Sequence, residues 1–250
     1  GEPCGLGMNS TTMAGVSGGR IWPQALFERL LRRTRRLLQA AGSNARLVVG
    51  GPGAWQLAQD PERLTALGVD HVVTGYCEAG IAAQFRQLLA GETLPPVLAG
   101  QPPTAAAIPP IRGAATMGAL ELSRGCGLGC DFCTLARVPM GHLPTDTILA
   151  DAATNLAAGN PNLSLLSEDF LRYGGQGVNC RPEALLDLLR QLRRFPVRLL
   201  QVDHVNAASV ARYTDDELRE LHDLLAGDRH GLVWVNLGIE SAAGELLEGC

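Results

Sequence analysis

The chain has 250 residues, of which 46% are hydrophobic and 18% are charged, and its formal net charge is -4 at pH 7. These values are typical of globular proteins and exclude an intrinsically disordered or fibrous chain, and the length is sufficient for two domains. All 21 basic residues are arginines, and the negative net charge argues against nonspecific nucleic-acid binding, because such binding requires a basic face.

The sequence predicts no membrane-spanning segment. Its longest apolar stretches, such as residues 232–239, are much shorter than the roughly 20 residues that cross a bilayer. The N-terminal residues do not resemble a signal peptide. Three of the seven cysteines lie close together, which fits a metal site in a reducing compartment better than a disulfide framework. We therefore expect a cytoplasmic protein.

The first part of the chain, residues 1–92, has the pattern of a small α/β domain. Hydrophobic residues at helical spacing predict a helix over 24–41, and the arginines between them are interpreted as its solvated face. A β-branched strand at 46–49 ends at the glycine-rich turn 50–53, which is followed by a helical stretch and a second strand at 71–74. This order predicts a parallel α/β sheet.

A proline-rich segment follows this domain. Residues 92–112 contain six prolines and show no hydrophobic periodicity. We therefore predict an extended linker over 93–115, with the domain boundary near residue 105.

The remainder, residues 116–250, alternates strands and helices. Strands are predicted at 119–123, 163–166, 198–202 and 232–237, and helices near 145–158, 182–194, 215–226 and from 241 onward. Repeated βα units of this size build a partial or complete (β/α) barrel, with the active site at the C-terminal ends of the strands.

The strongest chemical signal is a cysteine motif directly after the first of these strands. Cys126, Cys130 and Cys133 have the spacing C-x3-C-x2-C in a glycine-rich loop. Three thiolates can hold a cube of iron and sulfide, and the fourth iron then has no protein ligand. An iron that remains open can chelate the amino and carboxylate groups of a small ligand, which brings the ligand's reactive atom close to the cluster.

This motif resembles that of the radical S-adenosylmethionine (SAM) superfamily, in which an aromatic residue precedes the last cysteine. Phe132 occupies that position. The resemblance implies a [4Fe-4S] cluster on the three cysteines, reductive cleavage of SAM to a 5′-deoxyadenosyl radical, and an electron donor such as a flavodoxin or ferredoxin. The substrate cannot be read from the sequence.

Two other metal sites remain open as alternatives. A zinc site requires a fourth ligand, for which His142 is available. A noncatalytic iron-sulfur protein, either an electron carrier or a degenerate relative, requires a fourth cysteine, for which Cys180 is the near candidate.

The resemblance also assigns residues around SAM. Ser167, Glu168 and Asp169 follow the second barrel strand, where relatives contact the methionine amino group, and a carboxylate suits an ammonium ion. Glu240 and Ser241 follow the fourth strand, where relatives contact the ribose and the methionine carboxylate. The alternative for Asp169, Glu240 and Ser241 is capping of the following helix.

Three polar residues follow the third barrel strand, namely Asp203, His204 and Asn206. We expect them to face the active-site cavity. For His204, the alternative is a hydrogen-bonded histidine without a catalytic role.

The N-terminal domain resembles the cobalamin (B12)-binding domain of one branch of the superfamily. The similarity lies in the sequence Gly50-Gly51-Pro52 and in residues 72–78, both directly after strands. No Asp-x-His-x-x-Gly motif is present, so no histidine ligand to cobalt is implied. Cobalamin binding, with methyl transfer as the reaction, and a purely structural α/β domain both remain open.

The predicted fold is therefore α/β, with a small Rossmann-like domain followed by a partial (β/α) radical SAM barrel. Compared with the superfamily, a strand before the first domain and further βα units after the last helix are missing. We expect the chain to be truncated at both ends.

Overall fold

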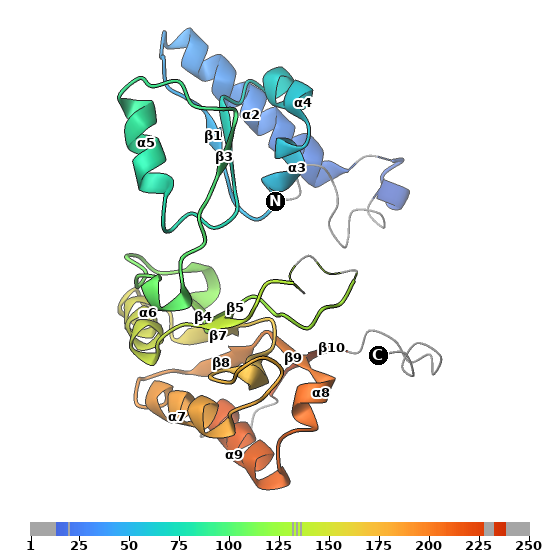
Figure 1. Cartoon of the computed structure of the whole chain (residues 1–250), viewed down its shortest axis with the longest axis vertical. Coiled ribbons are helices and arrows are strands. Elements are labelled where there is room, and N and C mark those ends of the chain that lie inside the picture. Colours follow the sequence, from blue (N-terminus) through green and yellow to red (C-terminus); the bar gives the residue numbers. More distant parts are fainter. Residues whose placement is uncertain are drawn as a thin grey trace. The chain divides into compact units, whose positions relative to one another are not determined.

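The computed structural model describes residues 14–19, 21–131, 133, 135, 137–227 and 233–238. These residues form two compact units, of which the first ends at Pro103 and the second begins at Thr104. Figure 1 labels most of the helices and strands of both units. The division lies within the segment that the sequence predicts as a linker.

The first unit contains a parallel sheet of three strands. β1 (Val48–Val49), β2 (His71–Thr74) and β3 (Val97–Ala99) are hydrogen-bonded in this order. The predicted parallel α/β sheet is therefore confirmed.

Four helices surround this sheet. They are α2 (Trp22–Ala40), α3 (Trp55–Ala58), α4 (Pro61–Leu67) and α5 (Ile81–Leu89). Figure 1 shows α2, α3 and α4 on one side of the sheet and α5 on the other. Leu31, Leu57, Leu64 and Leu67 form the core of this unit with Val72 of β2.

The third strand was not expected, because β3 lies within the predicted linker 93–115. Pro95 and Pro96 precede the paired residues, so the strand keeps its own N–H groups. Proline lacks an N–H group but retains its carbonyl, and the carbonyl of Pro96 accepts a hydrogen bond of 2.7 Å from the N–H of Val72. The prolines therefore mark the start of a strand in this part of the segment.

The second unit contains parallel strands that match the predicted βα alternation. β4 (Ala119–Glu121), β7 (Asn162–Leu166) and β8 (Leu199–Val202) form one parallel sheet in this order. Only Asp203 separates β8 from β9 (His204–Asn206), which pairs in parallel with β10 (Asn236–Gly238). Closure of these strands into a partial barrel stays a prediction.

The helices of this unit are α6 (Thr145–Ala157), α7 (Pro182–Leu192), the short α8 (Ala207–Val210) and α9 (Asp215–Ala226), with 3-10 turns at Ala105–Ala107, Thr116–Gly118 and Phe170–Arg172. Three of these helices, α6, α7 and α9, lie where the sequence predicts them, whereas the short α8 was not predicted. Thr214 and Glu217 form a capping box that explains the start of α9. The helix predicted from residue 241 lies outside the described residues.

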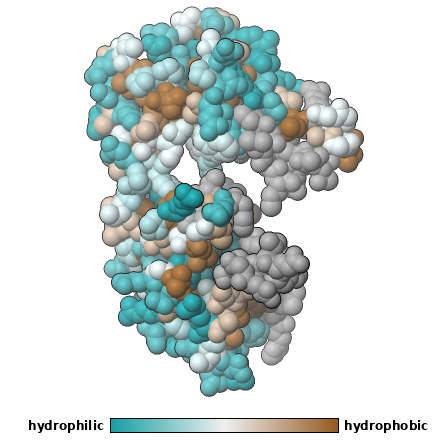
Figure 2. Space-filling model, turned by 45° about the vertical axis from the view of Figure 1, so that its right-hand side comes forward, coloured by the Kyte–Doolittle hydropathy of each residue, from teal (hydrophilic) through white to brown (hydrophobic). Residues whose placement is uncertain are grey.

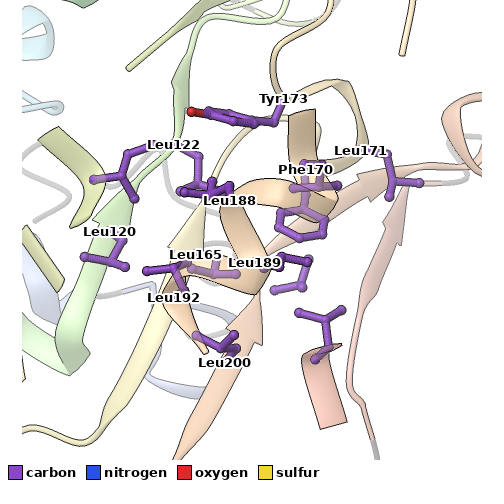
Figure 3. Close-up of a cluster of buried hydrophobic side chains, with 14 of the residues drawn as sticks. Leu120, Leu122, Leu165, Phe170, Leu171, Tyr173, Leu188, Leu189, Leu192 and Leu200 are labelled. Carbon is purple, nitrogen blue, oxygen red and sulfur yellow. The ribbon is translucent and has the colours of Figure 1, made fainter. Parts of the chain in front are cut away.

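A layer of leucines holds the helices to the sheet. The α7 residues Leu185, Leu188, Leu189 and Leu192 share one helix face and are completely buried. Figure 3 shows leucines of β4, β7 and β8 packed with those of α7 and with Phe170. Burial of each such side chain contributes about 1.5–3 kcal/mol, so this layer stabilises the packing of α7 on the sheet.

The predicted first strand of this unit is divided in two. β4 pairs with β7, whereas β5 (Ser123–Arg124) turns away and forms an antiparallel pair with β6 (Gly141–His142). Leu122 between them is completely buried. This hairpin encloses the cysteine loop.

Two buried polar side chains of α6 attach the segment that leads into β4. The carboxylate of Asp151 accepts a hydrogen bond of 2.8 Å from the N–H of Ile111. The amide of Asn155 accepts one of 2.8 Å from the N–H of Ala115 and donates one of 3.3 Å to the carbonyl of Ala119. The buried Asn155 therefore satisfies two partly buried backbone groups and positions the start of β4.

His142 joins the cysteine-loop hairpin to a loop of glycines. Its Nε2 lies 2.8 Å from the carbonyl of Gly175, which can only accept, so Nε2 carries the proton. Its Nδ1 then accepts the hydroxyl hydrogen bond of Ser123 at 2.8 Å. Burial lowers the pKa of His142, and the charge of Arg172 acts in the same direction. His142 is therefore a neutral structural link.

No helix among the described residues has both the length and the apolar character needed to cross a bilayer. On the face shown in Figure 2, hydrophilic residues are interspersed with hydrophobic ones.

We predict that Asn155→Ala lowers the free energy of unfolding by about 2–4 kcal/mol, because a completely buried side chain is truncated and two partly buried backbone groups lose their partner. Urea denaturation of the full chain measures this change. Asn162→Ala serves as the control, because Asn162 is exposed and its loss should cost less than about 0.5 kcal/mol. If both substitutions lower the free energy of unfolding by the same amount, the hydrogen bonds of Asn155 do not stabilise the start of β4.

The lowered pKa of His142 predicts that the stability of the fold depends on pH. The unfolded chain regains the ordinary histidine pKa of about 6.5, so below that pH it binds more protons than the folded chain. The free energy of unfolding should therefore fall as the pH decreases below about 6.5. In His142→Gln, whose amide keeps one donor and one acceptor, this part of the pH dependence should disappear. Urea midpoints at about pH 7.5 and about pH 5.5 test this, and parallel profiles for both proteins would contradict it.

Candidate functional site

The cysteine loop begins at a glycine that no other residue can replace without strain. Gly125 has φ +84°, and a Cβ there would lie 2.5 Å from the carbonyl oxygen of Pro139 and 2.8 Å from that of Val138. The N–H of Cys126 donates a hydrogen bond of 3.0 Å to the same Val138 carbonyl. Close backbone approach therefore sets the position of the first cysteine.

The rest of the loop turns tightly. Gly127 and Gly129 also have positive φ angles, of 71° and 84°. The N–H of Cys133 donates a hydrogen bond of 3.1 Å to the carbonyl of Cys130. This hydrogen bond closes a turn between the second and third cysteines.

All three cysteines of the motif are free thiols, and none is completely buried. Cys126 and Cys130 are half-buried and Cys133 is exposed. Among the described residues, no three His, Cys, Asp or Glu side chains converge as metal ligands do. The fit to an iron-sulfur cluster therefore depends on the donor set, since soft thiolates are the ligands of such clusters, and on the tight backbone of the loop. Phe132 lies outside the described residues.

Arg172 is a site residue that the sequence analysis missed. Its guanidinium is only 2% exposed and lies against the cysteine loop. Nη1 donates a hydrogen bond of 3.0 Å to the carbonyl of Cys126 and lies 4.0 Å from the Cys126 sulfur. Nε donates one of 3.1 Å to the carbonyl of Gly177, which also accepts from Nη2. No spacing rule singles out this arginine, because its contact to Cys126 spans 46 residues.

The three candidate residues after β7 have different environments. Ser167 is 6% exposed, and its hydroxyl accepts a hydrogen bond of 3.3 Å from the N–H of Asp169. Asp169 has no exposed surface, and its carboxylate accepts bonds from the Ser209 hydroxyl at 2.6 Å and from the N–H of Asn206 at 3.3 Å. Glu168 is exposed.

This geometry gives Asp169 a structural role. Its carboxylate fastens the end of β7 to the junction of β9 and α8, so it is neither a helix cap nor a free ligand group. Of the three residues, Glu168 alone has an exposed carboxylate that is available to a ligand.

The residues after β8 also differ in exposure and in hydrogen bonding. The side chain of Asn206 accepts a hydrogen bond of 2.8 Å from the N–H of Ala208 and so caps α8. Asp203 is exposed and His204 is half-buried. Glu240 and Ser241, the candidates after the fourth strand, lie outside the described residues.

The register of the sheet brings these segments to one edge. Glu121 pairs with Leu166, and Leu165 pairs with Val202. Because β4, β7 and β8 are adjacent and parallel, the segments that follow them leave the sheet at the same end. The cysteine loop, Glu168 and Asp203 therefore belong to one edge, as the sequence predicted.

No protein-family model matches the chain. In sequence it is similar to two ribosomal protein uS12 methylthiotransferases named RimO. The protein from Myxococcus xanthus is 30% identical over 123 residues, which cover 42% of this chain and 25% of the relative. The one from Oleidesulfovibrio alaskensis is 33% identical over 91 residues, which cover 34% of this chain and 21% of the relative. The matches thus span about a quarter of the length of these relatives.

In fold the chain is similar to the radical SAM methyltransferase TsrM from Kitasatospora setae. One structure of TsrM, with tryptophan and a SAM analogue bound, has a TM-score of 0.59 and 18% identity and covers 89% of this chain and 46% of TsrM. Another, with cobalamin and a [4Fe-4S] cluster bound, has a TM-score of 0.59 and 17% identity. At this identity the likeness concerns the fold. Together the comparisons confirm that the chain resembles the radical SAM superfamily, and its likeness to the cobalamin-containing TsrM is one of fold.

Proposed function

We propose that the chain is part of a radical SAM enzyme. Cys126, Cys130 and Cys133 would hold a [4Fe-4S] cluster, which supplies the electron that cleaves SAM to methionine and a 5′-deoxyadenosyl radical. The observation that carries the proposal is the set of three free thiols in one tight glycine loop at the C-terminal edge of a parallel sheet. Sequence similarity to RimO and fold similarity to TsrM support it.

The zinc alternative is disfavoured by the environment of His142. One ring nitrogen donates to the carbonyl of Gly175 and the other accepts from Ser123. A zinc ligand requires a free ring nitrogen, so ligation would break one of these buried hydrogen bonds.

The alternative of a noncatalytic electron carrier is disfavoured by the environment of Cys180. Its thiol packs against the hydrophobic core and lies 3.9 Å from the carbonyl of Ser209. Burial raises the pKa of Cys180, which disfavours the thiolate that a cluster needs. We therefore favour a cluster with three protein ligands and no ligand from Cys180.

Glu168 is the proposed contact of the methionine ammonium group. It follows β7 at the edge that carries the cysteine loop, and its carboxylate is exposed. An ionised carboxylate accepts a charge-assisted hydrogen bond from an ammonium ion. Phe132 beside the last cysteine, and Glu240 and Ser241 at the ribose and methionine carboxylate, remain proposals from the resemblance.

We also propose that the first unit binds cobalamin and that the reaction is methyl transfer to an unreactive carbon. Methylthiolation remains an alternative, since the RimO relatives are methylthiotransferases. The turn after β1 fits close approach of a large cofactor, because Gly51 has φ +104° and a Cβ there would meet no atom within 4 Å. One structure of TsrM contains bound cobalamin, which supports the same assignment.

An external electron donor is part of the proposal, because SAM cleavage consumes an electron. A flavodoxin or ferredoxin would serve, and the exposed Cys133 leaves that side of the loop accessible to it. The described cysteines are free thiols, which supports a reducing compartment.

Anaerobic reconstitution with iron and sulfide, followed by electron paramagnetic resonance of the reduced protein, tests the cluster. We expect a [4Fe-4S] signal that changes when SAM is added, because SAM would bind the iron without a protein ligand. Cys126→Ala should abolish the signal, whereas the control Cys180→Ala should retain it. Loss of the cluster in Cys180→Ala, or a signal indifferent to SAM, would favour the electron carrier.

Two adjacent carboxylates provide a matched pair of substitutions. Glu168→Gln should weaken SAM binding to the reconstituted protein by about tenfold or more without changing its stability, because it removes one charge-assisted hydrogen bond. Asp169→Asn should instead lower the free energy of unfolding by about 1–3 kcal/mol, because a buried acceptor is lost. Calorimetric titration and urea denaturation measure the two effects. Unchanged SAM affinity in Glu168→Gln would contradict the role of Glu168.

A further inference from the structure

Arg172 is a buried arginine that forms no ion pair among the described residues. Arginine stays protonated in proteins, and Arg172 is only 2% exposed. No carboxylate among the described residues forms an ion pair with it. Burying a charge in this way costs several kcal/mol unless something compensates it.

The hydrogen-bond acceptors of Arg172 compensate this charge only in part. They are the carbonyls of Gly177 and Cys126, which are neutral dipoles, and Nη1 also lies 4.0 Å from the Cys126 sulfur. The remaining positive charge therefore faces the first cysteine of the motif.

The other arginines near the cysteine loop differ from Arg172. Arg124 forms a two-pronged ion pair with Glu121, with distances of 2.6 and 2.7 Å. Arg137 is exposed and lies 3.8 Å from Asp131. Carboxylates and solvent therefore screen these two charges, whereas Arg172 is 2% exposed and has no ion pair with a described carboxylate.

We propose that Arg172 is a positioning residue for the iron-sulfur cluster whose charge raises the cluster's reduction potential. The proposal rests on the function proposed above. A cluster held by three thiolates is net negative, and one-electron reduction adds a further negative charge. A fixed positive charge and a hydrogen bond toward a ligand sulfur stabilise the reduced form most, and the burial of Arg172 strengthens both effects.

A redox titration of the reconstituted full chain, monitored by electron paramagnetic resonance, tests this role. Arg172→Gln removes the charge and should lower the ratio of reduced to oxidised cluster at a fixed potential by about tenfold, which is 59 mV for a one-electron couple. Arg172→Lys keeps the charge and should stay within about threefold of the wild type. Arg193→Gln is the matched control, because Arg193 also donates to backbone carbonyls, those of Leu224 and Leu225.

Each outcome distinguishes this role from the function itself. If the wild type assembles no [4Fe-4S] cluster, both proposals fail. If the wild type assembles one and Arg172→Gln leaves its midpoint unchanged, or shifts it no more than Arg193→Gln does, only the role of Arg172 fails. If Arg172→Gln binds no cluster, Arg172→Lys decides: a loaded cluster within threefold of the wild type supports the role of the charge, and a tenfold shift or no cluster overturns it.

Discussion

The parallel pairing of β4, β7 and β8 over one layer of leucines is the constraint on which the second unit depends. Almost no surface is exposed on the leucines of α7 or on Leu120, Leu165 and Leu200 of the three strands, so a shift of one strand by a single residue would turn buried side chains toward solvent. The register is therefore strongly determined. Because the strands are parallel, the same constraint gathers the segments that follow them at one edge, where the cysteine loop begins.

Buried polar side chains then fasten these segments to one another. Asn155 holds the chain that enters β4, His142 joins the cysteine-loop hairpin to Gly175, and Asp169 joins the end of β7 to the start of α8. Arg172 connects the loop after β7 to Cys126. Each of these groups satisfies backbone or side-chain partners far away in the sequence, so the loops at this edge are held by specific hydrogen bonds in addition to apolar packing.

The same contacts separate structural residues from residues that remain available for chemistry. Asp169, Asn206 and His142 use their polar atoms within the fold, whereas Glu168 is exposed and the three cysteines of the motif are free thiols. A thiol such as Cys180, half-buried against the hydrophobic core, is a poor ligand by comparison. The functional proposal thus draws on exposure and hydrogen bonding as much as on the spacing of the cysteines.

The sequence by itself determined the local features of this protein. The alternation of strand and helix patterns predicted β2, β7 and α7, and the spacing of Cys126, Cys130 and Cys133 indicated the metal chemistry, because each signal lies within a few neighbouring residues. Two kinds of feature were decided only by the tertiary structure. One is the strand β3, which pairs although two prolines precede it, since pairing depends on β2 and not on local propensity. The other is the role of each polar residue at the edge of the sheet: Glu168 and Asp169 are adjacent and both acidic, yet one is exposed and the other completely buried. The position of Arg172 at the candidate site depends on a contact with Cys126, which lies 46 residues away in the sequence. Such contacts have no periodic signature, because burial and long-range hydrogen bonds arise only when distant segments pack together.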